Sequence, residues 1–261
     1  MKTTKKLLLI LLCFSFFNLN ANARVKNNVN YNTAGLKLGA AFGFPLGSMP
    51  KGATGLPLPA PALGMFFSHK FTPKWSLQIG AEMYSLKTRF QTPYEQFEYI
   101  GNVEKYIYGQ PTDRIDTVFL DKAVVKGGLF NNRYLSLPVS ALYHFNKSWT
   151  LSFGAYVAYN FKKQMTGTAT DIYFGDRYNP EYSIEVDGTM PFNESDKIKD
   201  WDFGLNIGGN YELKSGINFD LRLNAGLVDF FVKEFTAPPS AYRNIILQTT
   251  VGYKIGGKSK G

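Results

Sequence analysis

The feature that most constrains the fold of this chain is an alternation of apolar and polar residues with a period of two. In residues 149–162, the odd positions from Trp149 to Phe161 are apolar or aromatic, and the even positions, ending at Lys162, are mostly small or polar. Because successive side chains of a β-strand point to opposite faces, this segment presents one oily face and one polar face. The same alternation recurs in residues 75–88, 201–213 and 217–228 and predicts an all-β fold.

Eight such segments predict eight strands, each long enough to cross a bilayer when tilted, which takes ~9–11 residues. The expected strands are residues 34–44, 60–71, 75–90, 132–145, 149–162, 200–213, 216–228 and 243–255. Short turns alternate with longer loops, at residues 45–59, 91–131, 163–199 and 229–242. This arrangement is typical of an outer-membrane barrel whose termini and short turns lie in the periplasm. We therefore expect an eight-stranded antiparallel up-and-down transmembrane β-barrel with long extracellular loops, in which Asp171–Phe174 pairs with Tyr182–Val186 above the membrane.

Alternation alone does not decide which face of the sheet meets solvent. A soluble barrel hides its oily face inside, whereas a membrane barrel turns it outward to lipid. The oily faces here are wide and end in aromatic residues, and the polar faces are rich in Gly, Ala, Ser and Asn, which fit the narrow interior of eight strands. We therefore expect contact with outer-membrane lipid, and the alternative is a secreted β-domain with its polar faces outside.

The first 23 residues have the composition of a secretory signal peptide. Three lysines precede the apolar run 7–17, which is too short to span a bilayer as a helix, and Ala21-Asn-Ala23 is a cleavage motif. This predicts export, a mature start at Arg24 and one barrel domain over residues 24–261. The lone cysteine, Cys13, lies inside the apolar run, so the alternative of a lipoprotein cysteine is disfavoured and no disulfide is expected.

An internal repeat supports the strand count. The segment 71–81, from Phe71 through Trp75, matches 145–155, from Phe145 through Trp149. Each reads as a strand end, a tight turn and a Trp that opens the next strand. Aromatic residues on both sides of a turn suit the interfacial belt of a membrane barrel, although ordinary aromatic packing in a soluble hairpin is the alternative.

Charged residues on the polar faces are expected inside the barrel. They are Lys37, Glu82, Asp202, Glu212, Asp220, Arg222 and Lys254. We expect Glu82, Asp202 and Asp220 to pair with Lys37 and Arg222, and we expect no open channel because eight strands leave room only for side chains. Gly35, Gly39 and Gly43 are expected to make room for bulky neighbours in the lumen. Pro138 lies in mid-strand and predicts a bulge or a position without a ladder hydrogen bond.

Three segments carry a family resemblance. The segment Arg133-Tyr-Leu-Ser-Leu-Pro-Val-Ser-Ala-Leu-Tyr-His-Phe145 resembles a strand of the PorT-like outer-membrane β-barrel family of Bacteroidota. Asp202-Phe-Gly-Leu-Asn-Ile-Gly-Gly-Asn-Tyr211 and Gln248-Thr-Thr-Val-Gly-Tyr253 are similar to later strands of that family. The resemblance implies a barrel in the outer membrane and, because founding members assist type IX secretion, a secretion-accessory role. It transfers no catalytic or binding residue, and the tail after the last strand departs from barrels that end on an aromatic.

The sequence offers little catalytic or metal-binding chemistry. His69 and His144 fall at the short-turn ends of two strands, where we expect interfacial polar roles rather than a metal pair. No nucleophile, phosphate-binding or zinc-protease motif occurs, so we expect no enzyme activity, no catalytic residue, no cofactor and no metal site. No basic stretch interleaves with aromatics as nucleic-acid binding would need.

Charge is divided between the two ends of the expected barrel. Without Lys2, Lys5 and Lys6, 26 basic residues face 20 acidic ones, a net charge of about +6. Residues 91–131 and 163–199 together hold 13 acidic and 8 basic residues, whereas lysines gather near the periplasmic turns. The acidic outer loops suit divalent cations or a protein partner, and ordinary solvated charge is the alternative.

Three functional hypotheses follow. The first is a non-enzymatic barrel that acts as a structural, interaction or secretion-accessory component through its long loops or its periplasmic face. The second is a transport barrel for small solutes or lipids, which conductance in planar bilayers separates from the first. The third, an outer-membrane hydrolase, needs an acid–base cluster at the loop mouth, and the sequence shows none there.

Overall fold

The computed structural model describes residues 31–47, 51–101, 116–176, 179–186, 188–233 and 242–255. The expected signal peptide and Cys13 lie outside the described residues. Within the described ranges, no helix is long and apolar enough to cross a membrane. All described regular structure consists of β-strands, except for one short 3-10 helix, η1 (Ser195–Lys197).

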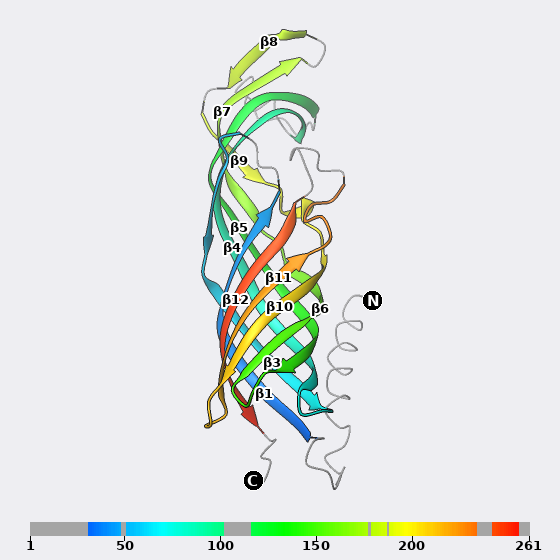
Figure 1. Ribbon diagram of the computed structural model, residues 1–261. Coiled ribbons are helices and arrows are strands. Elements are labelled where there is room, and N and C mark those ends of the chain that lie inside the picture. Colours follow the sequence, from blue (N-terminus) through cyan, green and yellow to red (C-terminus); the bar gives the residue numbers. More distant parts are fainter. Residues whose placement is uncertain are drawn as a thin grey trace, which may run out of the picture.

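Eight strands close into a ring (Figure 1). They are β1 (Tyr31–Leu46), β3 (Ala60–Lys70), β4 (Trp75–Gly101), β5 (Asp116–His144), β6 (Trp149–Lys162), β10 (Trp201–Glu212), β11 (Ile217–Gly226) and β12 (Arg243–Ile255). Each pairs antiparallel with the next in this order, and β12 pairs with β1, so the ring has no free edge. The predicted eight-stranded up-and-down barrel is confirmed, with every expected strand in place.

The register of the ring fixes the tilt of its strands. A path along paired residues from Ala34 of β1 passes once round the ring through Val139 and Ala225, and it returns to β1 at Phe44. This shear of about ten residues over eight strands corresponds to a tilt of about 40° from the barrel axis. Such a narrow barrel encloses a lumen that side chains fill.

The segments expected as long loops carry strands of their own. β4 and β5 continue beyond the ring and remain paired to Gly101 and Asp116. β7 (Met165–Asp176) adds to β5, and β8 (Asn179–Val186) and β9 (Met190–Asn193) add to β7, while β2 (Thr54–Leu58) adds to β4. We call β7, β8 and the continuations of β4 and β5 the extracellular arm, which rises above the barrel in Figure 1. The expected pairing of Asp171–Phe174 with Tyr182–Val186 is confirmed by the β7–β8 register.

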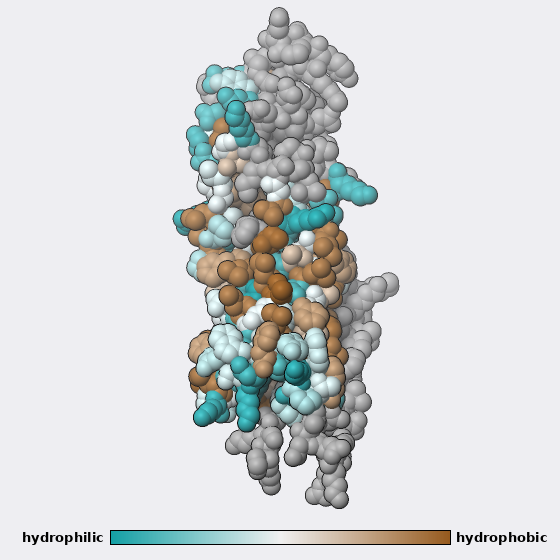
Figure 2. Space-filling view, viewed as in Figure 1, coloured by the Kyte–Doolittle hydropathy of each residue, from teal (hydrophilic) through white to brown (hydrophobic). Residues whose placement is uncertain are grey.

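The outer surface of the ring is apolar over its middle part. Large exposed side chains include Leu38, Met83, Phe153, Ile207 and Leu221, from five strands. Figure 2 shows hydrophobic residues across the middle of the barrel and hydrophilic ones towards both ends. Near the short turns the rings of Trp75 and Tyr143 lie 4.9 Å apart, and those of Trp149 and Tyr211 lie 4.8 Å apart. The oily faces therefore point outward, as expected for a membrane barrel with an aromatic belt.

Pro138 is accommodated without a bulge. The register between β4 and β5 passes from Ile79–Val139 to Glu82–Ser136 unshifted, and Pro138 keeps its partner Tyr156 on β6. A Cβ built on Gly80, opposite the proline, would lie 3.1 Å from the Pro138 Cγ. Gly80 thus makes room for the pyrrolidine ring of Pro138. Of the two predicted alternatives, a position without a ladder hydrogen bond agrees with this register, and a bulge does not.

Candidate functional site

The lumen contains a buried ion network at mid-height. The Lys37 Nζ lies 2.5 Å from the Glu82 Oε1, and the Arg222 Nη1 lies 2.7 Å from the same oxygen. The Arg222 Nη2 lies 3.6 Å from the Asp220 Oδ1. These residues come from β1, β4 and β11, which face one another across the narrow lumen, so the network joins opposite walls. The predicted pairing of Glu82 and Asp220 with Lys37 and Arg222 is confirmed.

Asp202 does not join this network, contrary to expectation. Its Oδ2 accepts hydrogen bonds from the Tyr156 hydroxyl at 3.0 Å and from the Asn244 Nδ2 at 2.9 Å. Asp202 lies at the start of β10, near the extracellular end, whereas Arg222 lies lower on β11. Opposite charge alone did not predict the partner of Asp202, because two side chains meet only when they lie at the same height in the lumen.

A layer of tyrosines lies above the ion network. The rings of Tyr84 and Tyr134 stack with centroids 5.4 Å apart, and Tyr156 packs in the same buried cluster.

Two of the glycines on β1 make room in the lumen as expected. A Cβ on Gly35 would lie 2.4 Å from the Phe66 Cζ, and one on Gly43 would lie 2.4 Å from the Leu86 Cδ2. At Gly39 the nearest atom is instead the Thr249 carbonyl oxygen of the neighbouring strand, 2.0 Å away.

Aromatic side chains close the extracellular mouth of the lumen. The Phe130 ring lies 4.5 Å from that of Phe90 and 5.7 Å from that of Phe230, and the rings of Phe231 and Tyr242 are 5.7 Å apart. Phe90 and Phe130 belong to β4 and β5, whereas the other three belong to the connection between β11 and β12, on the opposite side of the ring. This aromatic lid, completed by Met165 and Ile198, therefore spans the mouth.

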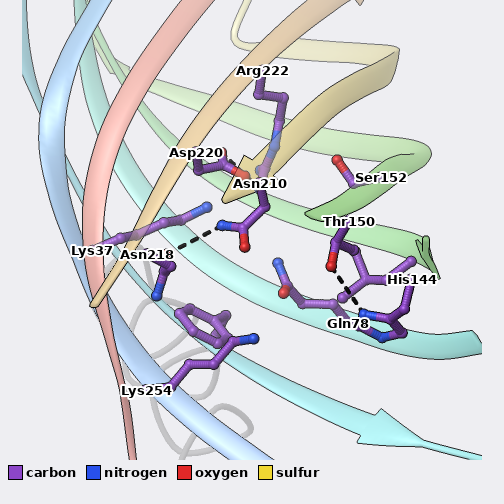
Figure 3. Close-up of a pocket in the computed structure, with 12 residues that line it drawn as sticks. Lys37, Gln78, His144, Thr150, Ser152, Asn210, Asn218, Asp220, Arg222 and Lys254 are labelled. Atoms are coloured by element: carbon purple, nitrogen blue, oxygen red, sulfur yellow. Dashed lines mark hydrogen bonds and ion pairs between the residues drawn. The ribbon is translucent and has the colours of Figure 1, made fainter. Parts of the chain in front are cut away.

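A small polar cavity occupies the periplasmic part of the lumen (Figure 3). It has a volume of about 30 Å³, which holds about two waters. Its lining includes Lys37, Gln78, His144, Asn218 and Lys254. Lys254 forms an ion pair with Glu212 at its lower rim. The cavity reaches up to the ion network, whose Lys37, Asp220 and Arg222 form part of its lining.

The two histidines make local hydrogen bonds. His69 is exposed, and its Nδ1 lies 2.7 Å from the Asn32 Oδ1. The His144 Nε2 lies 2.7 Å from the Ser76 Oγ, and its Nδ1 lies 2.9 Å from the Thr150 Oγ1. The two are not brought together with further ligands: among the described residues, no group of three or more His, Cys, Asp or Glu could hold a metal ion.

The described part of the extracellular arm has one apolar and one charged face. Ala123 and Val125 on β5, with Ile172 and Phe174 on β7, are buried. On the other face the Lys126 Nζ lies 3.3 Å from the Asp171 Oδ2. A hydrogen bond from the Thr170 hydroxyl, together with Lys126, holds the pKa of Asp171 below its ordinary value. This exposed face is therefore charged at neutral pH.

Most of the chain also matches a known family in sequence. The family model described as "Outer membrane protein beta-barrel domain" matches residues 35–232. The chain belongs to this family. It is an outer-membrane β-barrel protein, in agreement with the closed ring and its apolar outer band. No curated protein matches the chain in sequence.

Several solved barrels are similar in structure at low sequence identity. Ail of Yersinia pestis, solved in complex with the heparin analogue sucrose octasulfate, is 9% identical, with 86% of this chain and 99% of that one covered and a TM-score of 0.37. Neisserial surface protein A is 11% identical, with 86% and 97% covered and a TM-score of 0.36. OprG from Pseudomonas aeruginosa is 12% identical, with 87% and 97% covered and a TM-score of 0.36. The strand pairings themselves establish the ring.

Proposed function

We propose that the protein is a non-enzymatic interaction protein of the outer membrane, whose extracellular arm binds a protein partner. The observation that carries the proposal is the arm itself. The twelve residues from Phe90 to Gly101 add about 35 Å of strand beyond the barrel mouth. β7 and β8 widen this ribbon into a sheet. This sheet continues the barrel wall, and its last strand, β8, is paired on one edge with β7, so that within the described residues its other edge offers backbone groups for strand addition.

The packing of the lumen favours interaction over transport. Along the inward face of β4, Gln78 lines the cavity, Glu82 holds the ion network, Tyr84 lies in the tyrosine layer and Phe90 lies in the aromatic lid. A solute would have to displace three successive packed layers. The carboxylates of Glu82 and Asp220 are paired with Lys37 and Arg222, which leaves them poorly placed for acid–base catalysis.

The resemblance of residues 133–145 to PorT-like barrels supports a secretion-accessory form of this interaction role. Export would precede it, with residues 1–23 removed. N-terminal sequencing of the protein extracted from outer membranes is expected to begin at Arg24, because the Ala-Asn-Ala motif ends at Ala23. A first residue within 1–23, or an acylated Cys13, would contradict this processing.

The interaction role is testable with a photoreactive amino acid placed in intact cells. At Lys122 or Lys126, on the exposed face of the arm, we expect one discrete cross-linked product of reproducible mass after illumination. The reason is that a partner bound to the arm covers this face and lies within reach of both positions. Gel migration and mass spectrometry identify the product.

Lys74 and Lys147 supply the matched control. They are exposed lysines on two short turns at the opposite end of the barrel. The arm product is expected to be absent from these positions. Equal products from the arm and from the turns, or none from the arm, would remove the support for a partner there.

A further inference from the structure

A β-bulge turns one lysine outward at the extracellular end of β6. Arg133 pairs with Lys162, but the next residue, Tyr134, pairs with Asn160, so Phe161 is the extra residue. Strict alternation would place Lys162 on the luminal face with Asn160, as the sequence predicted. Instead Asn160 is buried, and both Phe161 and Lys162 are exposed. Bulges re-aim side chains in this way, and here the result is a cation on the outer wall.

Three more cations lie on the same wall as Lys162, one of them directly opposite it and two on the next strand but one. Arg133 is exposed directly opposite it on β5. On β4, Lys87 pairs with Asn131 and is therefore diagonal to Arg133, and Arg89 follows on the same face. Diagonal neighbours in a sheet lie about 7–8 Å apart, within reach of long side chains. We call Lys87, Arg89, Arg133 and Lys162 the basic patch.

The basic patch lacks internal compensation. None of its four members forms an ion pair with any residue that the structure describes. Like charges directly opposite one another destabilise a sheet, and Arg133 and Lys162 occupy such positions. Every described acidic side chain of the ring instead faces the lumen. An external anion would remove this repulsion.

The depth of the basic patch identifies the layer in which it lies. On β4, Lys87 comes four residues above Met83, an exposed member of the apolar band, and on β5 Arg133 comes two residues above Leu135. Phe161, exposed beside Lys162, keeps an aromatic ring at the same level. The patch therefore begins where the apolar band ends, at the level of outer-leaflet headgroups.

We propose that the basic patch binds the phosphate groups of a phosphorylated glycolipid of the outer leaflet. The chemistry fits: the four side chains bring four positive charges, and two of them are guanidinium groups, which bind phosphate oxygens in pairs. Cations just outside the hydrocarbon layer attract anionic headgroups, each contributing about fivefold in affinity. The proposal concerns the barrel wall and is independent of any partner of the arm.

Binding of diphosphoryl lipid A to the full-length mature protein in nonionic detergent, titrated by native mass spectrometry, tests the proposal. We expect the wild-type barrel to retain the lipid, and Lys87→Gln/Arg133→Gln/Lys162→Gln to bind it about a hundredfold more weakly, since three cations are lost. The matched control is Lys74→Gln/Lys147→Gln/Lys214→Gln, which removes the same charge from exposed lysines at the periplasmic turns. It is expected to bind as the wild type does.

Two outcomes would overturn the proposal. One is equal affinity in the wild type and the patch variant while both show the faster migration of an unboiled, folded barrel. The other is displacement of the lipid by an equal concentration of soluble pyrophosphate, which would assign the patch to a free anion. If the triple variant does not fold, the single variant Lys162→Gln tests the proposal instead, and about fivefold weaker binding of the lipid is expected for it.

Discussion

Glu82→Gln is expected to destabilise the folded barrel by about 3–5 kcal/mol. The change keeps the size of the side chain but removes the charge that Lys37 and Arg222 share. Asp220, whose Oδ1 lies 3.6 Å from the Arg222 Nη2, is then the only carboxylate of the network and cannot balance both cations. Urea unfolding of the barrel in lipid vesicles, followed by tryptophan fluorescence, measures the loss.

Two companion variants separate the network from a general effect of losing a carboxylate. Glu212→Gln breaks the ion pair with Lys254 at the more open periplasmic rim. We expect this change to lower the folding stability by less than about 1 kcal/mol. Lys37→Met combined with Glu82→Gln restores the charge balance and is expected to recover most of the lost stability, because the coupled residues are in contact. A double variant as unstable as Glu82→Gln alone would mean that the shape of Glu82, and not its charge, holds the lumen together.

The ring was predictable because the two faces of each of its strands meet different environments. Lipid lies on one side and a packed lumen on the other, so the apolar and polar residues alternate without interruption. Trp201 to Tyr211 on β10 obeys this rule throughout, and its strand was expected to within a residue of β10's ends. The short turns followed from the same pattern, since the alternation stops and restarts around them.

The sequence predicted the β7–β8 pairing of the arm, but not its pairing with β5 and not the basic patch, for a physical reason. The pairing of β5 with β7 contains three register shifts, at residues 120–122, 122–124 and 126–129 of β5, and each breaks the alternation that would have revealed a strand. The single bulge at Phe161 likewise reversed the direction of Lys162. A register shift depends on the partner strand, so one sequence segment read by itself does not contain it.

The aromatic lid and the hydrogen bonds of Asp202 depend on contacts between distant segments. Phe130 and Phe230 meet across the mouth although 100 residues separate them. Asp202 meets Asn244 because β10 and β12 flank the same part of the lumen. Composition and spacing give the charge and size of such residues, whereas the strand register decides which of them share a height.

Ile207→Arg is expected to cost about 2–4 kcal/mol of folding stability in a bilayer. Ile207 lies on the outer face of β10, opposite Phe153 and Leu223, in the middle of the apolar band. Its side chain is 53% exposed, so no packed core is disturbed by the change. The cost comes from placing a guanidinium group in hydrocarbon, and unfolding of the barrel in vesicles measures it.

Ile255→Arg is the matched control because the two positions differ in depth and hardly in exposure. Ile255 is 60% exposed at the periplasmic end of β12, and arginine there is expected to cost at most about 1 kcal/mol. If the outer face met water instead of lipid, both changes would stay within about 0.5 kcal/mol of the wild type. Equal small losses of stability at the two positions would thus contradict the membrane-facing assignment. A large loss at Ile207 alone would support the assignment of this residue to the hydrocarbon layer.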